Sequence, residues 1–302
     1  MRSLKYRLVE FFLIFLSHKK VFKLPVEKLI KYLNRTKGSR ITAAPRFINK
    51  RFNVEVKIIQ GRPCYRIEPK ESKNNNSGVF FIHGGGWIFE AHLVHWRAAS
   101  YLVRTLGIPV YFPVYPLIPD STLKDALTML NESFSFMTKE FKEENIVIIG
   151  DSAGASLTLS LCHWLKQQKL SMPKKLILVS PAMIYEDDPD VLKAMQAIAA
   201  RDRLVDFNYL QTFRKIAGIK EKDILSASML GNFSGFPDMH IFSGTYEFMY
   251  PQALAFFELL KTQGIIAKLY TGNKMQHVWP YLPFAVECKK ALKEVAEVAG
   301  EL

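Results

Sequence analysis

The chain has 302 residues, enough for one large α/β domain with insertions, and its length does not require a second domain. Hydrophobic residues make up 49% and charged residues 23%, which is typical of a globular protein and excludes a disordered chain. The net charge of +13 favours anionic partners. No basic run dominates and no nucleic-acid motif occurs, so we predict no nucleic-acid partner.

The three cysteines, Cys64, Cys162 and Cys288, are far apart and form no CxxC pair. This spacing does not suggest zinc binding or redox chemistry, and it is typical of reduced thiols in a cytoplasmic protein. His92 and His95 form a possible metal pair, but the sequence offers no third ligand nearby. We therefore predict neither a metal nor an organic cofactor.

The first 20 residues, MRSLKYRLVEFFLIFLSHKK, imitate a signal peptide because a basic start precedes an apolar run. Glu10 interrupts this run, no small-residue cleavage site follows, and 8–16 is far shorter than the roughly 20 residues that span a bilayer. We expect a basic amphipathic helix here. It either covers the protein's own core, which we prefer, or lies on an anionic membrane surface. The expected location is cytoplasmic, with peripheral membrane contact as the alternative.

From residue 52 onward, apolar strand patterns alternate with helical patterns. Strands are expected at 54–60, 63–70, 78–84, 108–115, 145–152, 174–181, 239–244 and 266–272. Helices are expected at 94–107, 122–141, 153–168, 251–264 and 284–299. This βαβ progression predicts an α/β fold with a mostly parallel sheet covered by helices on both faces. Residues 186–225 interrupt it with helical, highly charged sequence, as an insertion that forms a lid would.

A strand that ends in GDSAG, residues 150–154, runs directly into a helix. The sharp turn forces Ser152 into a strained conformation and requires small neighbours, which Gly150 and Gly154 provide. Its hydroxyl then lies at the carboxyl end of the sheet, above a helix N-terminus. The alternative, an ordinary helix-capping serine, does not need this strand–turn–helix context. We predict that Ser152 is a nucleophile.

The motif HGGG follows an earlier strand at residues 83–86. Acyl transfer needs backbone N–H donors for the oxyanion, from the residue after the nucleophile and from such a loop. We assign these donors to Ala153, Gly84 and Gly85. A phosphate-binding loop is disfavoured, because the chain has neither GK[ST] nor GxGxxG at this place. His83 is expected to orient the glycine loop.

A triad in the chain order serine, acid, histidine requires a histidine after the last strand. Of the seven histidines, His277 lies between the final strand and the final helix. Glu247 follows the preceding strand at its carboxyl end, whereas Asp238 lies at the amino end. Ser152, Glu247 and His277 are therefore the predicted catalytic residues.

Several motifs together resemble the hormone-sensitive lipase family of α/β-hydrolases, which are serine esterases and lipases. They are HGGGW at 83–87, GDSAG at 150–154, VYPLIPDSTLKDAL at 114–127, GTYE at 244–247, and the pair Gln276-His277. The resemblance covers roughly residues 78–290 and implies the same triad. It also implies a helical cap, so the expected organisation is a cap segment at 1–50, an α/β-hydrolase core at 51–185 and 226–302, and a cap insertion at 186–225.

Three residues depart from the family pattern. Glu247 replaces the usual aspartate and must reach His277 with a longer side chain. Glu90 replaces a glycine after HGGGW, which puts a charge near the pocket or changes the bend of the loop. Ala155 replaces a second glycine after GDSAG, a mild change.

The expected activity is hydrolysis of a small-molecule ester with a small or medium acyl group, through an acyl-enzyme intermediate. Two alternatives stay open: an amidase or peptidase with the same triad, and a ligand-binding protein with an idle triad. Aromatic residues in the cap segments suggest an apolar acyl or alcohol group, or ordinary packing between cap and core. They are Phe11, Phe12, Phe15, Phe207, Tyr209 and Phe213.

Overall fold

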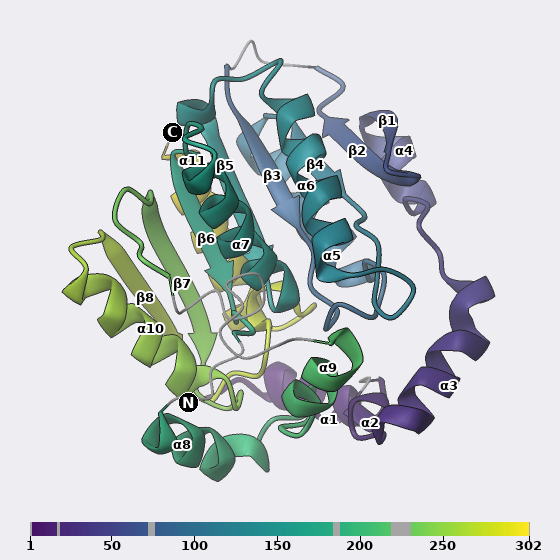
Figure 1. Ribbon diagram of the computed structural model, residues 1–302, viewed down its shortest axis with the longest axis vertical. Helices are drawn as coiled ribbons and strands as arrows, with labels where there is room; N and C mark the ends of the chain where they lie inside the picture. The colour runs from purple at the N-terminus through teal and green to yellow at the C-terminus, as the bar shows by residue number, and fades with distance from the viewer. Residues whose placement is uncertain (1, 17–18, 72–75, 184–187, 219–230, 302) are drawn as a thin grey trace.

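The computed structural model describes residues 2–16, 19–71, 76–183, 188–218 and 231–301 (Figure 1). Residues 1 and 17–18 of the expected cap segment, and residues 186–187 and 219–225 of the expected cap insertion, lie outside the described residues. Within the described residues, no helix is long and apolar enough to cross a membrane.

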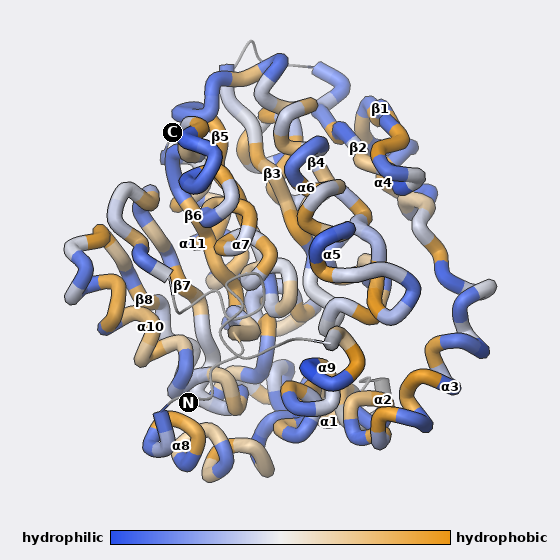
Figure 2. Tube along the Cα trace, in the orientation of Figure 1, coloured by the Kyte–Doolittle hydropathy of each residue, from blue (hydrophilic) through white to orange (hydrophobic). Residues whose placement is uncertain are grey.

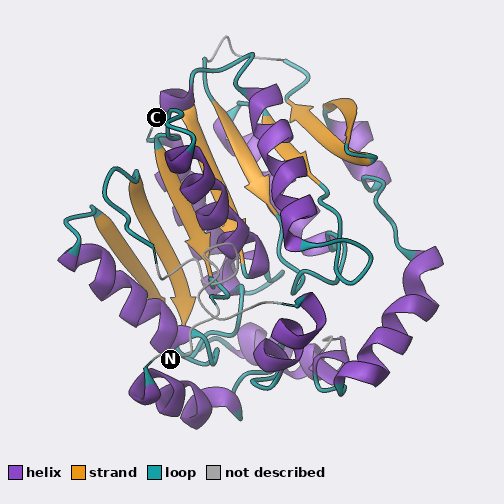
Figure 3. Cartoon of the chain, in the orientation of Figure 1, coloured by secondary structure: helices purple, strands orange, loops and turns teal. Residues whose placement is uncertain are grey.

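Eight strands of the described chain form one sheet (Figure 3). They are β1 (Asn53–Ile59), β2 (Arg62–Glu68), β3 (Gly78–Ile82), β4 (Val110–Pro113), β5 (Ile146–Asp151), β6 (Lys175–Val179), β7 (Asp238–Gly244) and β8 (Ala267–Gly272). Their order is β1-β2-β4-β3-β5-β6-β7-β8. The pairs β1–β2 and β2–β4 are antiparallel and all others are parallel. The expected mostly parallel sheet is confirmed, and each expected strand is present.

Helices join and cover these strands. They are α1 (Leu4–Leu16), α2 (Lys19–Phe22), α3 (Val26–Thr36), α4 (Arg46–Arg51), α5 (Leu93–Leu106), α6 (Leu123–Met137), α7 (Ala153–Gln167), α8 (Pro189–Ala199), α9 (Tyr209–Ala217), α10 (Tyr250–Thr262) and α11 (Val286–Gly300). Short 3₁₀ helices lie at Lys37–Ser39, Glu143–Asn145 and Trp279–Tyr281.

The sheet separates two hydrophobic cores, because alternate side chains of a strand point to opposite faces. In β3, Phe80 and Ile82 belong to the core under α6, α7 and α10. Val79 and Phe81 belong to the core under α4, α5 and α11. Each central strand is therefore buried on both faces, which explains its continuous apolar sequence. Figure 2 shows this apolar interior beneath helices with hydrophilic outer faces.

The helices α1, α2, α3, α8 and α9 gather at one end of the sheet, where the parallel strands end (Figure 1). The N-terminal segment and the mid-chain insertion thus lie over the same edge. The short helix α4 differs, since it lies beside β1 and Ile48 packs into the core under α5. The expected boundary at residue 50 therefore falls inside a helix that packs on the sheet.

Candidate active site

Ser152 lies in the turn between β5 and α7, with φ +51° and ψ −121°. A side chain at Gly150 would come within 2.6 Å of the carbonyl oxygen of Gly154, and one at Gly154 would collide with the backbone of Ile82 and His83. The turn thus has the strained geometry of a nucleophile elbow, and both glycines are needed to form it.

A continuous chain of hydrogen bonds joins Ser152, His277 and Glu247. The Nε2 atom of His277 lies 2.9 Å from the Ser152 hydroxyl, and its Nδ1 atom lies 2.7 Å from the Glu247 carboxylate. All three side chains are buried. The structure therefore brings together the three residues that the sequence pattern selected, with the imidazole between the hydroxyl and the acid.

Glu247 reaches the imidazole because its side chain folds back over the end of β7. Its other carboxylate oxygen accepts hydrogen bonds from the Gly244 amide, at 2.8 Å, and from the Ser243 hydroxyl. These two donors fix the orientation of the carboxylate and leave one oxygen for His277. Ser243 is not among the predicted site residues, although its place in FSGTYE, shortly before the acid, is a signal for this role.

Opposing effects act on the pKa of His277. Burial lowers it, but the hydrogen bond and charge of Glu247, followed by the charges of Asp202 and Asp151, raise it overall above the usual 6.5. The surrounding carboxylates thus stabilise the imidazolium, the form that arises when the histidine takes a proton from a hydroxyl.

The glycine loop requires one correction to the sequence analysis. The Gly84 amide donates to the Asp151 carboxylate at 3.1 Å, so it is not free to bind an oxyanion. The amides of Gly85, Gly86 and Ala153 donate to no acceptor in the described part of the chain. Gly85 and Gly86 also line the cavity that contains Ser152. The set of free donors is therefore shifted by one residue along the loop.

Close protein neighbours account for the three consecutive glycines. A Cβ at Gly84 would lie 3.0 Å from that of Ser152, and one at Gly85 would lie 2.6 Å from the Phe89 carbonyl oxygen. A Cβ at Gly86 would lie 2.9 Å from the Phe22 ring. Positive φ angles of +122° and +61° at Gly85 and Gly86 also disfavour side chains. Positions 84–86 therefore require glycine even in the absence of a ligand.

His83 and Asp151 hold this loop against the nucleophile turn. The His83 Nδ1–H donates to the Gly84 carbonyl at 2.7 Å, and burial followed by the charge of His95 lowers the pKa of His83 well below 6.5. His83 thus stays neutral and orients the loop, the role expected of it. The Nε2 atom of His95 lies 3.2 Å from Asp151. His95 is therefore part of the scaffold of the loop.

Glu90 points away from the cavity that contains Ser152. Its carboxylate pairs with Arg62 of β2 at 2.5 Å. Burial raises the pKa of Glu90 overall, although the hydrogen bond and charge of Arg62 oppose this shift. The negative charge of Glu90 is therefore balanced by Arg62 of β2 and does not face Ser152.

The cavity beside Ser152 has a volume of about 470 Å³ and a mainly apolar lining. Its lining residues include Val9, Leu13, Phe22, Phe89, Leu204, Val205, Val278, Leu282, Pro283 and Phe284. They come from α1, α2, the glycine loop between β3 and α5, the insertion and the loop of His277. By contrast, Tyr209 and Phe213 pack on the glycine loop: the Tyr209 hydroxyl donates to the Gly86 carbonyl, and the Phe213 ring stacks 4.1 Å from Trp87. For these two aromatic residues, packing between cap and core is the better interpretation. The side chains of Phe12 and Phe15 lie outside the described residues.

Gln276, directly before His277, connects the histidine loop to α1 and to the insertion. Its backbone amide donates to the Tyr6 hydroxyl at 2.7 Å, and its carboxamide donates to Glu10 at 2.7 Å and to the Arg201 carbonyl at 3.0 Å. It also accepts from the Arg203 amide at 2.8 Å. The helix α1 therefore helps to position His277, which favours the expectation that it covers the core.

The insertion also places a buried carboxylate, Asp202, near the triad. It accepts backbone hydrogen bonds from Leu204 at 2.8 Å, Val205 at 3.0 Å and Phe248 at 3.2 Å. Burial raises its pKa, although the charge of His277 opposes this. Sequence reasoning missed Asp202 because a single aspartate in a charged insertion carries no motif.

Within the described residues, no group of three or more histidine, cysteine or acidic side chains is arranged to hold a metal. His92 and His95 interact with each other, since the His92 amide donates to the Nδ1 atom of His95 at 2.9 Å. The three cysteines are buried and free.

A model of the α/β-hydrolase fold family matches residues 79–281, which is more than half of the chain. This chain is an α/β-hydrolase. The match spans the glycine loop, the nucleophile turn and the loop of His277.

Curated relatives and solved structures agree with this family. An esterase from Acinetobacter venetianus is 27% identical over 295 residues, covering 91% of this chain and 95% of the relative. A crystal structure of a putative esterase from Staphylococcus aureus has a TM-score of 0.81 at 22% identity, covering 92% of each chain. An esterase from the bacterial hormone-sensitive lipase family has a TM-score of 0.81 at 19% identity, covering 100% of this α/β-hydrolase and 99% of that chain. The resemblance to the hormone-sensitive lipase family is confirmed.

Proposed function

We propose that this α/β-hydrolase is a serine carboxylesterase that cleaves small or medium acyl esters through Ser152, His277 and Glu247. The observation that carries the proposal is the hydrogen-bond chain from the Ser152 hydroxyl through both nitrogens of His277 to Glu247, at 2.9 and 2.7 Å. The enzyme class itself, a carboxylic ester hydrolase, follows from the family and its esterase and lipase relatives.

In the first step, the Ser152 oxygen attacks the ester carbonyl carbon while the Nε2 atom of His277 takes the hydroxyl proton. The other ring nitrogen keeps its hydrogen bond to Glu247, whose charge stabilises the imidazolium. The raised pKa of His277 is consistent with this role. His277 then gives the proton to the departing alcohol, and the acyl group stays on Ser152.

The negative oxygen of the tetrahedral intermediate needs donors that already point at it. We assign these donors to the amides of Gly85, Gly86 and Ala153, because they have no acceptor within the described chain. Ala153 is also the first residue of α7, so the positive end of the helix dipole lies at the oxyanion.

In the second step, His277 removes a proton from water, and the water oxygen attacks the acyl carbon. The bond from this carbon to the Ser152 oxygen then breaks, His277 returns the proton to that oxygen, and the carboxylic acid is released. The sequence of steps needs only the groups of the triad, the amide donors and water. In both steps the proton passes through the Nε2 atom of His277.

The cavity supports an apolar acyl or alcohol group of limited length. Its volume is about 470 Å³, and α1, α2 and the insertion close over it. We propose that residues 1–45 and the insertion at 186–225 act together as a cap that selects the substrate. Contact of α1 with an anionic membrane stays a prediction.

The proposal is tested by p-nitrophenyl esters of increasing acyl length together with a matched p-nitroanilide. We expect ester turnover that declines from butanoyl to dodecanoyl chains and exceeds anilide turnover. Faster cleavage of the anilide would identify an amidase, and no turnover of either compound would identify a binding protein with an idle triad.

A further inference from the structure

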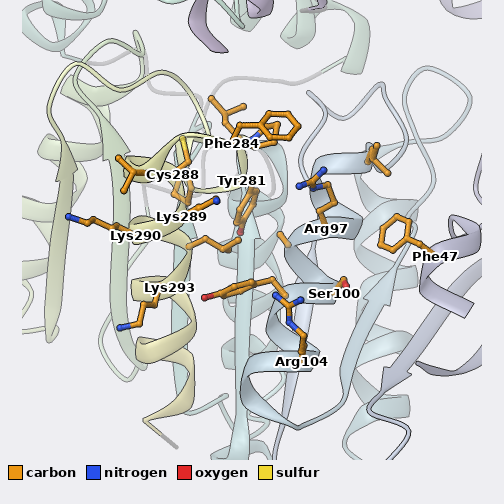
Figure 4. A pocket seen from close by; sticks show the side chains of 18 of the residues that line it. Phe47, Arg97, Ser100, Arg104, Tyr281, Phe284, Cys288, Lys289, Lys290 and Lys293 are labelled. Carbon is orange, nitrogen blue, oxygen red and sulfur yellow. The ribbon is translucent and has the colours of Figure 1, made fainter. Parts of the chain in front are cut away.

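A second cavity, of about 780 Å³, lies between α5 and α11, on the face of the sheet opposite to α7 (Figure 4). Its basic lining residues are Arg51, Arg97, Arg104, Lys289, Lys290 and Lys293. No acidic residue of the described chain lines it. A concave surface that is lined by positive charges alone concentrates positive potential, so the cavity attracts anions.

Aromatic rings hold three of these cations in place. The guanidinium of Arg97 lies 5.7 Å from the centre of the Phe284 ring, and that of Arg104 lies 5.6 Å from the Tyr101 ring. A guanidinium against a ring keeps the N–H donors along its edge available for a carboxylate or phosphate. Arg51 lies in the same way over a ring, 5.8 Å from Phe47.

The positive charges of the lining are largely without counter-charges. Among its basic residues in the described chain, Lys293 alone is in an ion pair, with Glu297 at 2.8 Å. Figure 4 shows Lys290 and Lys293 pointing away from the other labelled side chains, whereas Arg97 and Lys289 lie on either side of Tyr281 and Arg104 lies beyond Ser100. The buried Tyr281 hydroxyl also has no hydrogen-bond partner in the described chain. The lining thus combines these cations with the hydroxyl-bearing residues Ser100, Tyr101 and Tyr281, and no carboxylate of the described chain faces them.

Beside these donors, the cavity has an apolar rim. Leu93, Phe284 and Val286 line it with 56%, 67% and 49% of their surface exposed. Large exposed apolar side chains at a concave site favour an apolar ligand group. Leu93, Leu282, Pro283 and Phe284 also line the cavity of Ser152, so a thin wall of side chains separates the two.

We propose that this cavity binds a single-chain amphiphile with an oxyanion head, such as a medium-chain carboxylate. The head lies among Arg97, Arg104 and Lys289, and the chain lies along Leu93 and Phe284. A carboxylic acid released by ester hydrolysis belongs to this chemical class. Binding at the cavity depends only on the anionic head and the apolar chain, and it does not require that this protein produces the ligand.

The test is a calorimetric titration with decanoate below its micelle concentration. The wild type is compared with the double variant Arg97→Gln/Arg104→Gln and with the control Lys124→Gln/Lys139→Gln, which removes two exposed charges in and just after α6. We expect binding that weakens about tenfold or more in the first variant and is unchanged in the control. If the double variant does not fold, the single variant Lys289→Gln is used, with a smaller expected loss.

Four outcomes would overturn the proposal. They are no decanoate binding to the wild type, equal binding by the arginine variant, binding of neutral decanol as tight as that of decanoate, and binding of inorganic phosphate as tight as that of decyl phosphate. A further arm of the experiment uses anionic lipid vesicles. Arginine-dependent binding to vesicles without binding of monomeric decanoate would make the cavity a membrane contact and would also contradict the proposal.

Discussion

The carboxamide of Gln276 donates a 2.7 Å hydrogen bond to Glu10, although 266 positions separate the two residues. Gln276 precedes His277, and Glu10 lies in α1. The first helix is therefore part of the support of the proposed catalytic histidine, and changes at the N-terminus are expected to affect activity.

Tyr6→Phe tests this support. The Tyr6 hydroxyl accepts the Gln276 amide at 2.7 Å in a buried place, so its removal leaves an unsatisfied N–H and costs about 1–3 kcal/mol. We expect a lower melting temperature and a lower kcat for a p-nitrophenyl ester. Tyr32→Phe, in α3, is the matched control and should change neither. An unchanged kcat in Tyr6→Phe would show that α1 does not position His277.

Ser152→Ala should abolish turnover while the melting temperature stays near that of the wild type. The hydroxyl is the attacking group, and the loss expected for a triad serine is about a millionfold. Ester hydrolysis and labelling with a fluorophosphonate probe measure the effect, with the labelled peptide identified by mass spectrometry. A label on any serine other than Ser152 would refute the assignment.

The activity should fall as the pH decreases through the pKa of His277, which lies above 6.5. Protonated imidazole cannot accept the serine proton, so the acidic limb of the kcat/KM profile reports this pKa. Glu247→Gln removes the main partner that raises the pKa, so the limb should move to lower pH while kcat falls by several orders of magnitude.

Two variants serve as comparisons for Glu247→Gln. Glu247→Asp keeps the charge and should lose less activity. Asp238→Asn, at the amino end of β7, should behave as the wild type. Loss of activity in Asp238→Asn with retention in Glu247→Gln would reverse the assignment.

Gly85→Ala should lower kcat more than it raises KM. A Cβ there would lie 2.6 Å from the Phe89 carbonyl oxygen, so the loop must shift and a proposed oxyanion donor moves, a loss of about a hundredfold or more. Gly235→Ala is the control, because Gly235 also has a positive φ, +80°, but a Cβ would meet no atom within 4 Å. If both variants lost the same factor in kcat, backbone strain alone would explain the loss, and the role of Gly85 as an oxyanion donor would be contradicted.

The sequence contained much of the fold and the candidate site, because both are encoded in short segments. Alternating apolar patterns predicted the strands and helices from β1 to α11, and the elbow at Ser152 followed from small residues at fixed offsets. The order serine, acid, histidine then selected Glu247 and His277, since the carboxyl ends of parallel strands meet at one edge of the sheet.

Only the tertiary structure decided how these residues are held. The capture of the Gly84 amide by Asp151 depends on how closely the loop after β3 approaches the end of β5, and the contact of Glu247 with His277 joins the segments that follow β7 and β8. The links from Gln276 to α1 and from Asp202 to the triad, and the basic cavity between α5 and α11, join residues distant along the chain. A local pattern encodes backbone geometry, whereas contacts between distant segments arise from the packing of whole elements and have no signature in one sequence.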